Sequence, residues 1–200
     1  MAGPIEFYFD FSSPYGYVGA TRIAAIAAQH GRTVEWKPML LGAVFKITGS
    51  GPLPSLPLKG DYARRDMPRT ARFYGVEFKM PDQFPIVTLA PARAICWLRE
   101  KAPEKVEAAV LALYRAYFVD GKDISSPETT AEVLSGLGVD SAALLAALGD
   151  PAVKDRLKAD TQSAIDRGVF GSPYVIVDGE PFWGNDRFDQ LERWLSQGGF

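Results

Sequence analysis

The sequence predicts an α/β fold in which both ends of the chain build one sheet and a helical block is inserted between them. Residues 5–40 contain two strand-like segments separated by a segment of helical length. Residues 43–150 contain segments of helical periodicity divided by Pro or Gly. Residues 151–200 return to a helix, two short strand-like segments and a final helix. We therefore expect a sheet-bearing domain of residues 1–42 and 151–200, and an inserted all-helical subdomain of residues 43–150.

The first segment, IEFYFDF (5–11), is rich in aromatic residues and alternates large with polar or small ones, which favours a strand. Pro14 suits the first turn of a helix, and helical spacing continues from there to Gly31. TVEWKPML (33–40) predicts a second strand. Because a helix-length crossover separates the two strands, we expect them to be parallel.

In the middle of the chain, a Gly/Pro-rich loop, ITGSGPLPSLPLKG, precedes a series of helices. Ser126, followed by Pro, and Asp140 are expected to be the N-caps of two of them. In the last quarter we expect a helix near 151–168 and then a hairpin that turns at Asp178-Gly179. The final helix, NDRFDQLERWLSQ, is expected to begin with Asn185 as its cap.

The composition indicates a protein with one substantial core and no strong charge. The chain has 200 residues, is 47% hydrophobic and carries a formal net charge of -2. This charge gives no field that would attract nucleic acid or an anionic membrane, so a small or neutral partner is expected. No apolar run approaches the roughly 20 residues that span a bilayer. The N-terminal MAGPIEFYF lacks the features of a signal peptide, so we expect a cytoplasmic location.

The single cysteine and the single histidine exclude several kinds of site. One Cys cannot form an intrachain disulfide, and one His cannot begin a His-based metal site, so no metal is expected. Cys96 lies in a helical segment and is expected to be a buried packing thiol. His30 precedes Gly31 and marks a helix end. A mechanism that needs a Ser-His or Cys-His pair therefore has no support.

Three short segments could carry chemistry. Ser13 stands where a strand passes into a helix, beside unsatisfied helix N–H groups that favour an anion, although a plain N-cap also explains it. Ser172-Pro173 precedes a buried strand, where a cis proline would leave backbone groups free for a ligand, whereas an ordinary trans proline is the alternative. Capping explains Asn185, but Asp186 is equally placed to bind a ligand ammonium.

Together these segments resemble the 2-hydroxychromene-2-carboxylate isomerases, over essentially the whole chain. The resemblance rests on the FxFxSPY start, the GSP before a strand and the WGNDR before the last helix. It implies a thioredoxin-like fold, shared with the kappa-class glutathione transferases and the DsbA-type disulfide oxidoreductases. Where the oxidoreductases carry Cys-Pro-x-Cys, this chain has Ser13, Pro14, Tyr15 and Gly16. Without either sulfur it cannot exchange dithiols with its own atoms.

The resemblance also implies a cofactor, glutathione, and assigns residues to it. Ser13 is expected to stabilise the glutathione thiolate and to be the catalytic residue. The backbone of Ser172 would pair with the cysteinyl backbone, and the γ-glutamyl end would be held by the segment Trp183, Gly184, Asn185 and Asp186. Lys46 would bind the carboxylate of the aromatic substrate, and the family implies a homodimer. The chain departs from the family at Leu53-Pro54 and Phe84-Pro85, where apolar residues replace polar ones.

The expected function is a glutathione-dependent isomerisation of an aromatic substrate in aromatic hydrocarbon catabolism, by reversible thiolate addition. One alternative is a kappa-class transferase or peroxidase, which uses the same sulfur site. Another is a module that binds glutathione or a peptide without catalysis.

Overall fold

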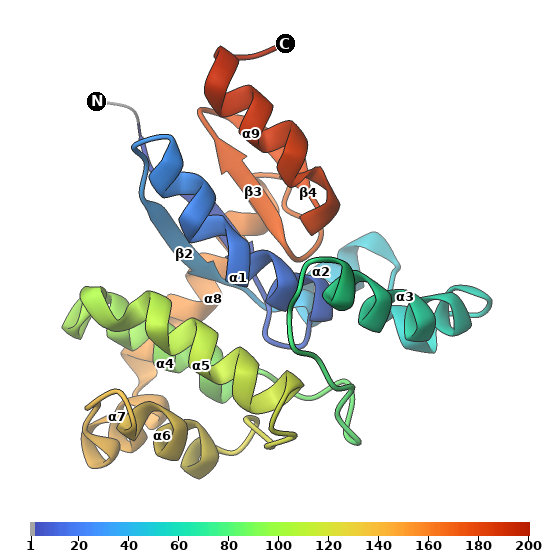
Figure 1. Cartoon of the computed structure of the whole chain (residues 1–200). Coiled ribbons are helices and arrows are strands. Elements are labelled where there is room, and N and C mark those ends of the chain that lie inside the picture. Colours follow the sequence, from blue (N-terminus) through green and yellow to red (C-terminus); the bar gives the residue numbers. More distant parts are fainter. Residues whose placement is uncertain (1–2) are drawn as a thin grey trace.

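Four short strands form one mixed sheet in the order β2-β1-β3-β4 in the computed structural model, which describes residues 3–200 (Figure 1). The first two strands are parallel and β3 runs antiparallel to both of its neighbours. The parallel pair, the hairpin at Asp178-Gly179 and the single sheet built from both chain ends are therefore confirmed. The strands are β1 (Ile5–Phe9), β2 (Val34–Pro38), β3 (Tyr174–Val177) and β4 (Glu180–Trp183).

Helix α1 (Pro14–Gln29) connects the two parallel strands. Its N-cap is Ser13, whose Oγ accepts a hydrogen bond from the Gly16 N–H at 3.0 Å. Its C-cap is His30, so both predicted ends are confirmed. This helix brings Ser13 to the end of β1 where the site lies.

The predicted Gly/Pro-rich loop holds more regular structure than expected. Helix α2 (Leu41–Thr48) begins before it, one 3₁₀ turn, η1 (Leu53–Ser55), lies within it, and α3 (Lys59–Phe73) begins at its end. The remaining helices of the middle block are α4 (Leu89–Lys101), η2 (Pro103–Lys105), α5 (Val106–Phe118), α6 (Pro127–Ser135) and α7 (Ser141–Gly149). Ser126 and Asp140 cap α6 and α7 through their side chains, as predicted.

One large hydrophobic core runs from the sheet into the helical block. It joins Phe7 and Trp36 of the sheet to Tyr114 and Phe118 of α5. Helix α8 (Pro151–Asp166) packs against α4 and α7 as well as β2. The division at residues 43 and 150 stays a prediction, because this core is shared by both parts.

Cys96 lies in a smaller core cluster between α4 and α8 and is fully buried. Burial raises the pKa of its thiol to about 12, with the nearby Asp160 acting in the same direction. The thiol is therefore un-ionised at neutral pH, and its expected role as a packing group is confirmed. No helix within residues 3–200 is long and apolar enough to cross a membrane.

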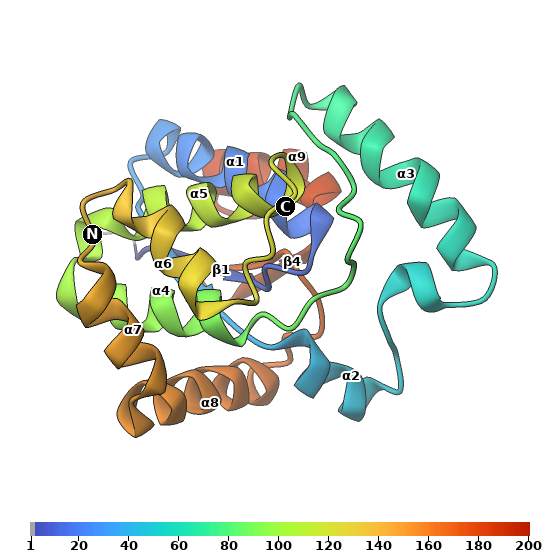
Figure 2. The ribbon, with the colours of Figure 1, turned by 90° about the horizontal axis from the view of Figure 1, so that it is seen from below.

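Helix α3 projects from one side of the molecule, away from α4 to α8 (Figures 1 and 2), whereas α2 packs beside the end of α8. Among the described residues, no member of α3 belongs to a hydrophobic core cluster. A cavity lies between this projecting part and the rest of the protein.

A polar cluster ties β1 to the end of α8. The Arg167 guanidinium pairs with both carboxylate oxygens of Glu6, and the Tyr8 hydroxyl donates to the same carboxylate at 2.9 Å. Lys37 Nζ lies 3.3 Å from it. Burial alone would raise the pKa of Glu6, but the hydrogen bonds from Arg167 and Tyr8 outweigh it and lower the pKa to about 2.

This lowered pKa predicts an acid-dependent loss of stability. Since the folded pKa lies below the ordinary value, the stabilisation is complete above about pH 4.5 and is lost as the pH falls towards 2. Between about pH 6 and pH 2.5 we expect the wild type to lose about 1 kcal/mol more unfolding free energy than Glu6→Gln. Urea unfolding measures this difference. Glu35→Gln is the control, because Glu35 pairs with the same Lys37 but does not contact Arg167; a loss equal to that of Glu6→Gln would contradict the assignment.

Candidate functional site

A cavity of about 800 Å³ lies where the N-terminus of α1, the β4 end and the α2–α3 part meet. Every predicted glutathione residue lines it: Ser13, Ser172, Trp183, Gly184, Asn185 and Asp186. These residues come from both ends of the chain, and the fold brings them to one wall. The facing wall belongs to α2, η1 and α3.

The wall near Ser13 is built around the buried carboxylate of Asp10, directly after β1. Its Oδ1 accepts hydrogen bonds from the N–H and the hydroxyl of Ser12, both at 2.8 Å, and from the Thr88 hydroxyl at 2.9 Å. Its Oδ2 accepts from the Leu41 N–H at 2.8 Å. One side chain therefore fixes the loop before α1 and the starts of α2 and α4.

The backbone of Asp10 extends this connection to Ser172. The Asp10 N–H donates to the Ser172 Oγ at 3.0 Å, and the Asp10 carbonyl accepts from the Tyr114 hydroxyl at 2.9 Å. The Ser13 N–H donates to the same carbonyl. Asp10 was not predicted, although a charged residue that interrupts the apolar run FYFDF could have identified it.

Ser13 is buried and serves both as a cap and as part of the cavity wall. Its hydroxyl donates to the Ser172 carbonyl at 2.7 Å while its oxygen accepts from Gly16. The N-cap interpretation is thus correct, and it does not exclude a functional role.

The first turn of α1 also leaves a backbone donor free. Pro14 has no N–H, the Gly16 N–H is capped by the Ser13 hydroxyl, and the Tyr17 N–H donates to the Ser13 carbonyl. In the described part of the chain the Tyr15 N–H has no acceptor. A free amide at a helix N-terminus favours an anion at this end of the cavity.

Gly16 stands at the position that the resemblance gives to the second cysteine of Cys-Pro-x-Cys. A Cβ atom there would lie 2.7 Å from both the Ser172 Oγ and the Tyr114 hydroxyl. This is closer than real Cβ atoms approach, so a side chain at residue 16 would have to displace the Ser172 Oγ and the Tyr114 hydroxyl.

The peptide bond between Ser172 and Pro173 is cis, as the sequence analysis considered. A second cis bond, Phe84-Pro85, also lies at the cavity and was not predicted. Ser172 of the first bond and both residues of the second bond line the cavity.

The prediction that Asn185 caps the last helix is wrong. Residues Asn185–Arg187 form a 3₁₀ turn, η3, and α9 (Phe188–Gln197) begins only after it; neither has a side-chain cap. The Asn185 side chain instead lies buried at the cavity wall, and its Nδ2 has no hydrogen-bond partner among the described residues. Arg22 fixes this turn by donating to the Asn185 carbonyl at 3.0 Å. Within residues 3–200, this wall of the cavity therefore contains an unpartnered donor that is buried behind its surface.

Asp186 and Trp183 complete this wall. The Asp186 carboxylate is exposed and accepts a hydrogen bond from Arg187 at 2.8 Å. Trp183 is 56% exposed and contacts Phe170 edge to face, with ring centroids 4.8 Å apart. The indole lies so close over Gly171 that a side chain there would have to displace it.

Lys46 is the one predicted site residue that does not line the cavity. It is exposed on α2, whereas Leu41, Phe45 and Thr48 of the same helix face the cavity. The cations at the cavity are Lys59, Arg69 and Arg187. The predicted contact of Lys46 with a substrate carboxylate therefore has no support from the geometry.

A cluster around Asp66 of α3 was not predicted. Its carboxylate accepts hydrogen bonds from the hydroxyl of Tyr15 at 2.6 Å and of Tyr62 at 3.1 Å, and it pairs with Arg69. Tyr15 is 51 residues away in sequence, so only the fold reveals this contact. Within residues 3–200 no three His, Cys, Asp or Glu side chains form a metal-binding cluster.

Comparison with known proteins agrees with this geometry. A family model described as a DSBA-like thioredoxin domain matches residues 4–196. A 2-hydroxychromene-2-carboxylate isomerase of Pseudomonas putida is 32% identical over 191 residues, which cover 94% of this chain and 92% of the relative. Glutathione S-transferase kappa 2 of Caenorhabditis elegans is 28% identical over 206 residues, which cover 96% and 92%.

A solved structure of a 2-hydroxychromene-2-carboxylate isomerase superposes with a TM-score of 0.86 at 29% identity, covering 96% of this chain and 94% of that one. The predicted thioredoxin-like α/β fold is confirmed. The relatives named here are enzymes, isomerases and kappa transferases. Because the family model spans nearly all of the sequence, the chain belongs to the family of DSBA-like thioredoxin domains.

Proposed function

We propose that the protein is a glutathione-dependent isomerase that acts on an aromatic ene-pyruvate such as 2-hydroxychromene-2-carboxylate, in aromatic hydrocarbon catabolism. The observation that carries the proposal is that the wall of one cavity holds Ser13 at a helix N-terminus together with Asn185, whose buried Nδ2 has no hydrogen-bond partner among the described residues. The named isomerase and kappa transferase relatives support it.

The residues present fit glutathione at both of its ends. The Tyr15 N–H and the Ser13 hydroxyl are donors for an anionic sulfur. At the other end of the wall, the Asn185 Nδ2 is a donor for a carboxylate and Asp186 is an acceptor for an ammonium. Glutathione, when bound, supplies the nucleophilic sulfur that adds reversibly to an electrophilic carbon and leaves again.

Ser13 can act without a base in the chain. A thiol with a pKa of about 8.5 needs about 2.7 kcal/mol of differential stabilisation for a shift of two pKa units. One hydrogen bond to a charged group contributes about 1.5–3 kcal/mol and the helix dipole up to about 1 kcal/mol. To donate to sulfur, the Ser13 hydroxyl must leave the Ser172 carbonyl, which then becomes free to accept an N–H of the tripeptide.

A kappa-type transferase is the second candidate, because the organic side of the cavity is mostly apolar. Leu53, Pro54, Phe84 and Pro85 line it, and Lys46 does not. Such a wall suits an apolar electrophile that glutathione would conjugate irreversibly.

Incubation with glutathione and 2-hydroxychromene-2-carboxylate tests the proposed function. We expect the isomer to form with no net loss of thiol, because the sulfur is released again. Stoichiometric loss of thiol would show the transferase instead. Measurable glutathione affinity without acceleration of this or any other electrophile would show a binding module.

Replacing Ser13 by Ala is expected to raise the pKa of the bound thiol by about 1–2 units, because one charge-assisted hydrogen bond is lost. Ultraviolet titration of the thiolate in the complex measures the shift. The variant is also expected to lose about 1 kcal/mol of stability with the N-cap.

Ser126→Ala is the matched control, because Ser126 stands in a second Ser-Ser-Pro segment and caps α6 in the same way, outside the cavity. We expect a similar or smaller loss of stability and an unchanged titration. A thiolate pKa that is the same in Ser13→Ala and the wild type would refute the role of Ser13.

Replacing Asp186 by Ala is expected to weaken glutathione binding about tenfold, which corresponds to about 1.4 kcal/mol, with a smaller change in unfolding free energy. The exposed carboxylate contributes little to stability through its pair with Arg187. Calorimetric titration and urea unfolding measure the two effects. Asp189→Ala is the control, because Asp189 is exposed in the first turn of α9 and does not line the cavity; equal affinities in the two variants would count against Asp186.

A further inference from the structure

Helix α3 forms one wall of the cavity but has few apolar contacts with the rest of the protein. Its buried face consists of small residues and Met67, and none of its residues within the described chain joins a hydrophobic core cluster. Pro68 also removes one hydrogen bond inside the helix. Figures 1 and 2 show the helix extending away from the body. Its position must therefore depend on a few specific contacts.

The contact in the middle of the helix is made by Asp66. Among the described residues its carboxylate has four donors, and three of them, Tyr62, Arg69 and Thr70, belong to α3 itself. The fourth, the Tyr15 hydroxyl, comes from the first turn of α1 and is the nearest of the three hydroxyl donors, at 2.6 Å. This hydrogen bond therefore links α3 to the helix that Ser13 caps.

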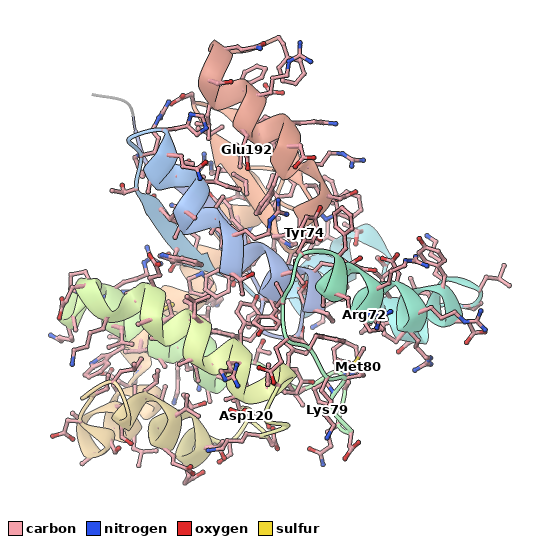
Figure 3. All side chains as sticks on the ribbon, viewed as in Figure 1. Arg72, Tyr74, Lys79, Met80, Asp120 and Glu192 are labelled. Atoms are coloured by element: carbon pink, nitrogen blue, oxygen red, sulfur yellow. The ribbon has the colours of Figure 1, made fainter. Side chains whose placement is uncertain are left out.

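Two further contacts lie at the C-terminal end of α3. The Arg22 guanidinium stacks on the Tyr74 ring at 3.9 Å, and the Tyr17 hydroxyl donates to the Glu77 carbonyl at 3.1 Å. Figure 3 shows Tyr74 at this end of α3, close to the start of α9. The stacking on Tyr74 and the hydrogen bond to Glu77 hold the C-terminal end of α3. The α3 residues Met67 and Thr70, which line the cavity, come earlier in the helix.

We propose that Asp66 is a positioning residue, which fixes the α3 wall through the hydroxyl of Tyr15 and so sets the space for the organic substrate beside Ser13. The inference rests on the proposed function and concerns the substrate side of the same cavity. Met67, Thr70 and Phe73 of α3 line that side. If α3 moved outwards, these side chains would leave the substrate while the glutathione wall stayed in place.

The ionisation of the two groups supports a strong hydrogen bond. Burial and the Asp66 carboxylate raise the pKa of Tyr15, so its hydroxyl stays protonated at neutral pH. Burial alone would raise the pKa of Asp66, but the hydrogen bonds from Tyr15 and Arg69 outweigh it and lower the pKa. A neutral donor and a charged acceptor form a charge-assisted hydrogen bond.

The matched pair Tyr15→Phe and Tyr62→Phe tests the proposal in the full chain. Each removes one hydroxyl from the same carboxylate, but only Tyr15 links α3 to another element. By amide hydrogen exchange we expect the α3 amides to exchange about tenfold faster in Tyr15→Phe and within about twofold of wild type in Tyr62→Phe. Exchange in the sheet should not change. Equal exchange of α3 in the two variants would overturn the proposal.

Two further measurements separate positioning from a general loss of structure. Tyr15 and Tyr62 both line the cavity, so the two variants are compared with 2-hydroxychromene-2-carboxylate. We expect KM to rise about fivefold in Tyr15→Phe and to change less than about twofold in Tyr62→Phe, because only in the first does a smaller fraction of molecules have the α3 wall in place. A lowered kcat at unchanged KM would contradict this. In an Asp66→Ala background, Tyr15→Phe should add nothing to the exchange of α3, and an additive effect would show that the two residues act independently.

The outcomes also distinguish this inference from the proposed function. A wild type that binds no glutathione or does not convert the substrate overturns the proposed function. In that case the exchange of α3 in the two tyrosine variants still supports or overturns the role of Asp66.

Discussion

The buried carboxylate of Asp10 is the interaction on which the rest of the site depends. A buried charge with no cation beside it is costly unless hydrogen bonds satisfy it, and four donors do so here. Two of the donors lie at the starts of α2 and α4, where helix dipoles also favour a negative charge. Through its backbone, the same residue holds Ser172 and the Tyr114 hydroxyl. The geometry of Ser13 thus follows from one residue that need not touch any ligand.

The two walls of the cavity differ in how firmly they are held. The wall that carries Ser13 and Ser172 belongs to the sheet and the main core, with hydrogen bonds that cross more than 100 residues of sequence. The α3 wall has small buried residues and a polar contact at Asp66. Such a division is consistent with the proposed function, in which one wall would bind glutathione and the other an organic substrate.

Much of the fold follows from local sequence, whereas the errors arise where distant contacts decide. The strands, the parallel pair and the caps Ser13, Ser126 and Asp140 are set by patterns a few residues long. The predicted cap at Asn185 was wrong because this segment begins with the 3₁₀ turn η3, which has no side-chain cap. Local sequence also does not reveal that the buried Asn185 Nδ2 has no hydrogen-bond partner among the described residues. The contact of Lys46 with a substrate stays a prediction, and its side chain is exposed on α2, a helix that was not predicted. Asp10 and Asp66 act through partners far along the chain.

The crowding at Gly16 limits how this lineage could change its chemistry. A single substitution to cysteine at that position would place the new side chain against the Tyr114 hydroxyl and the Ser172 Oγ, both of which already serve Asp10. A dithiol at residues 13 and 16 would require these two side chains to move or to be replaced by smaller ones, and either change would weaken the support of the existing site. Packing around Gly16 thus disfavours a cysteine at this position, whatever ligand the site binds.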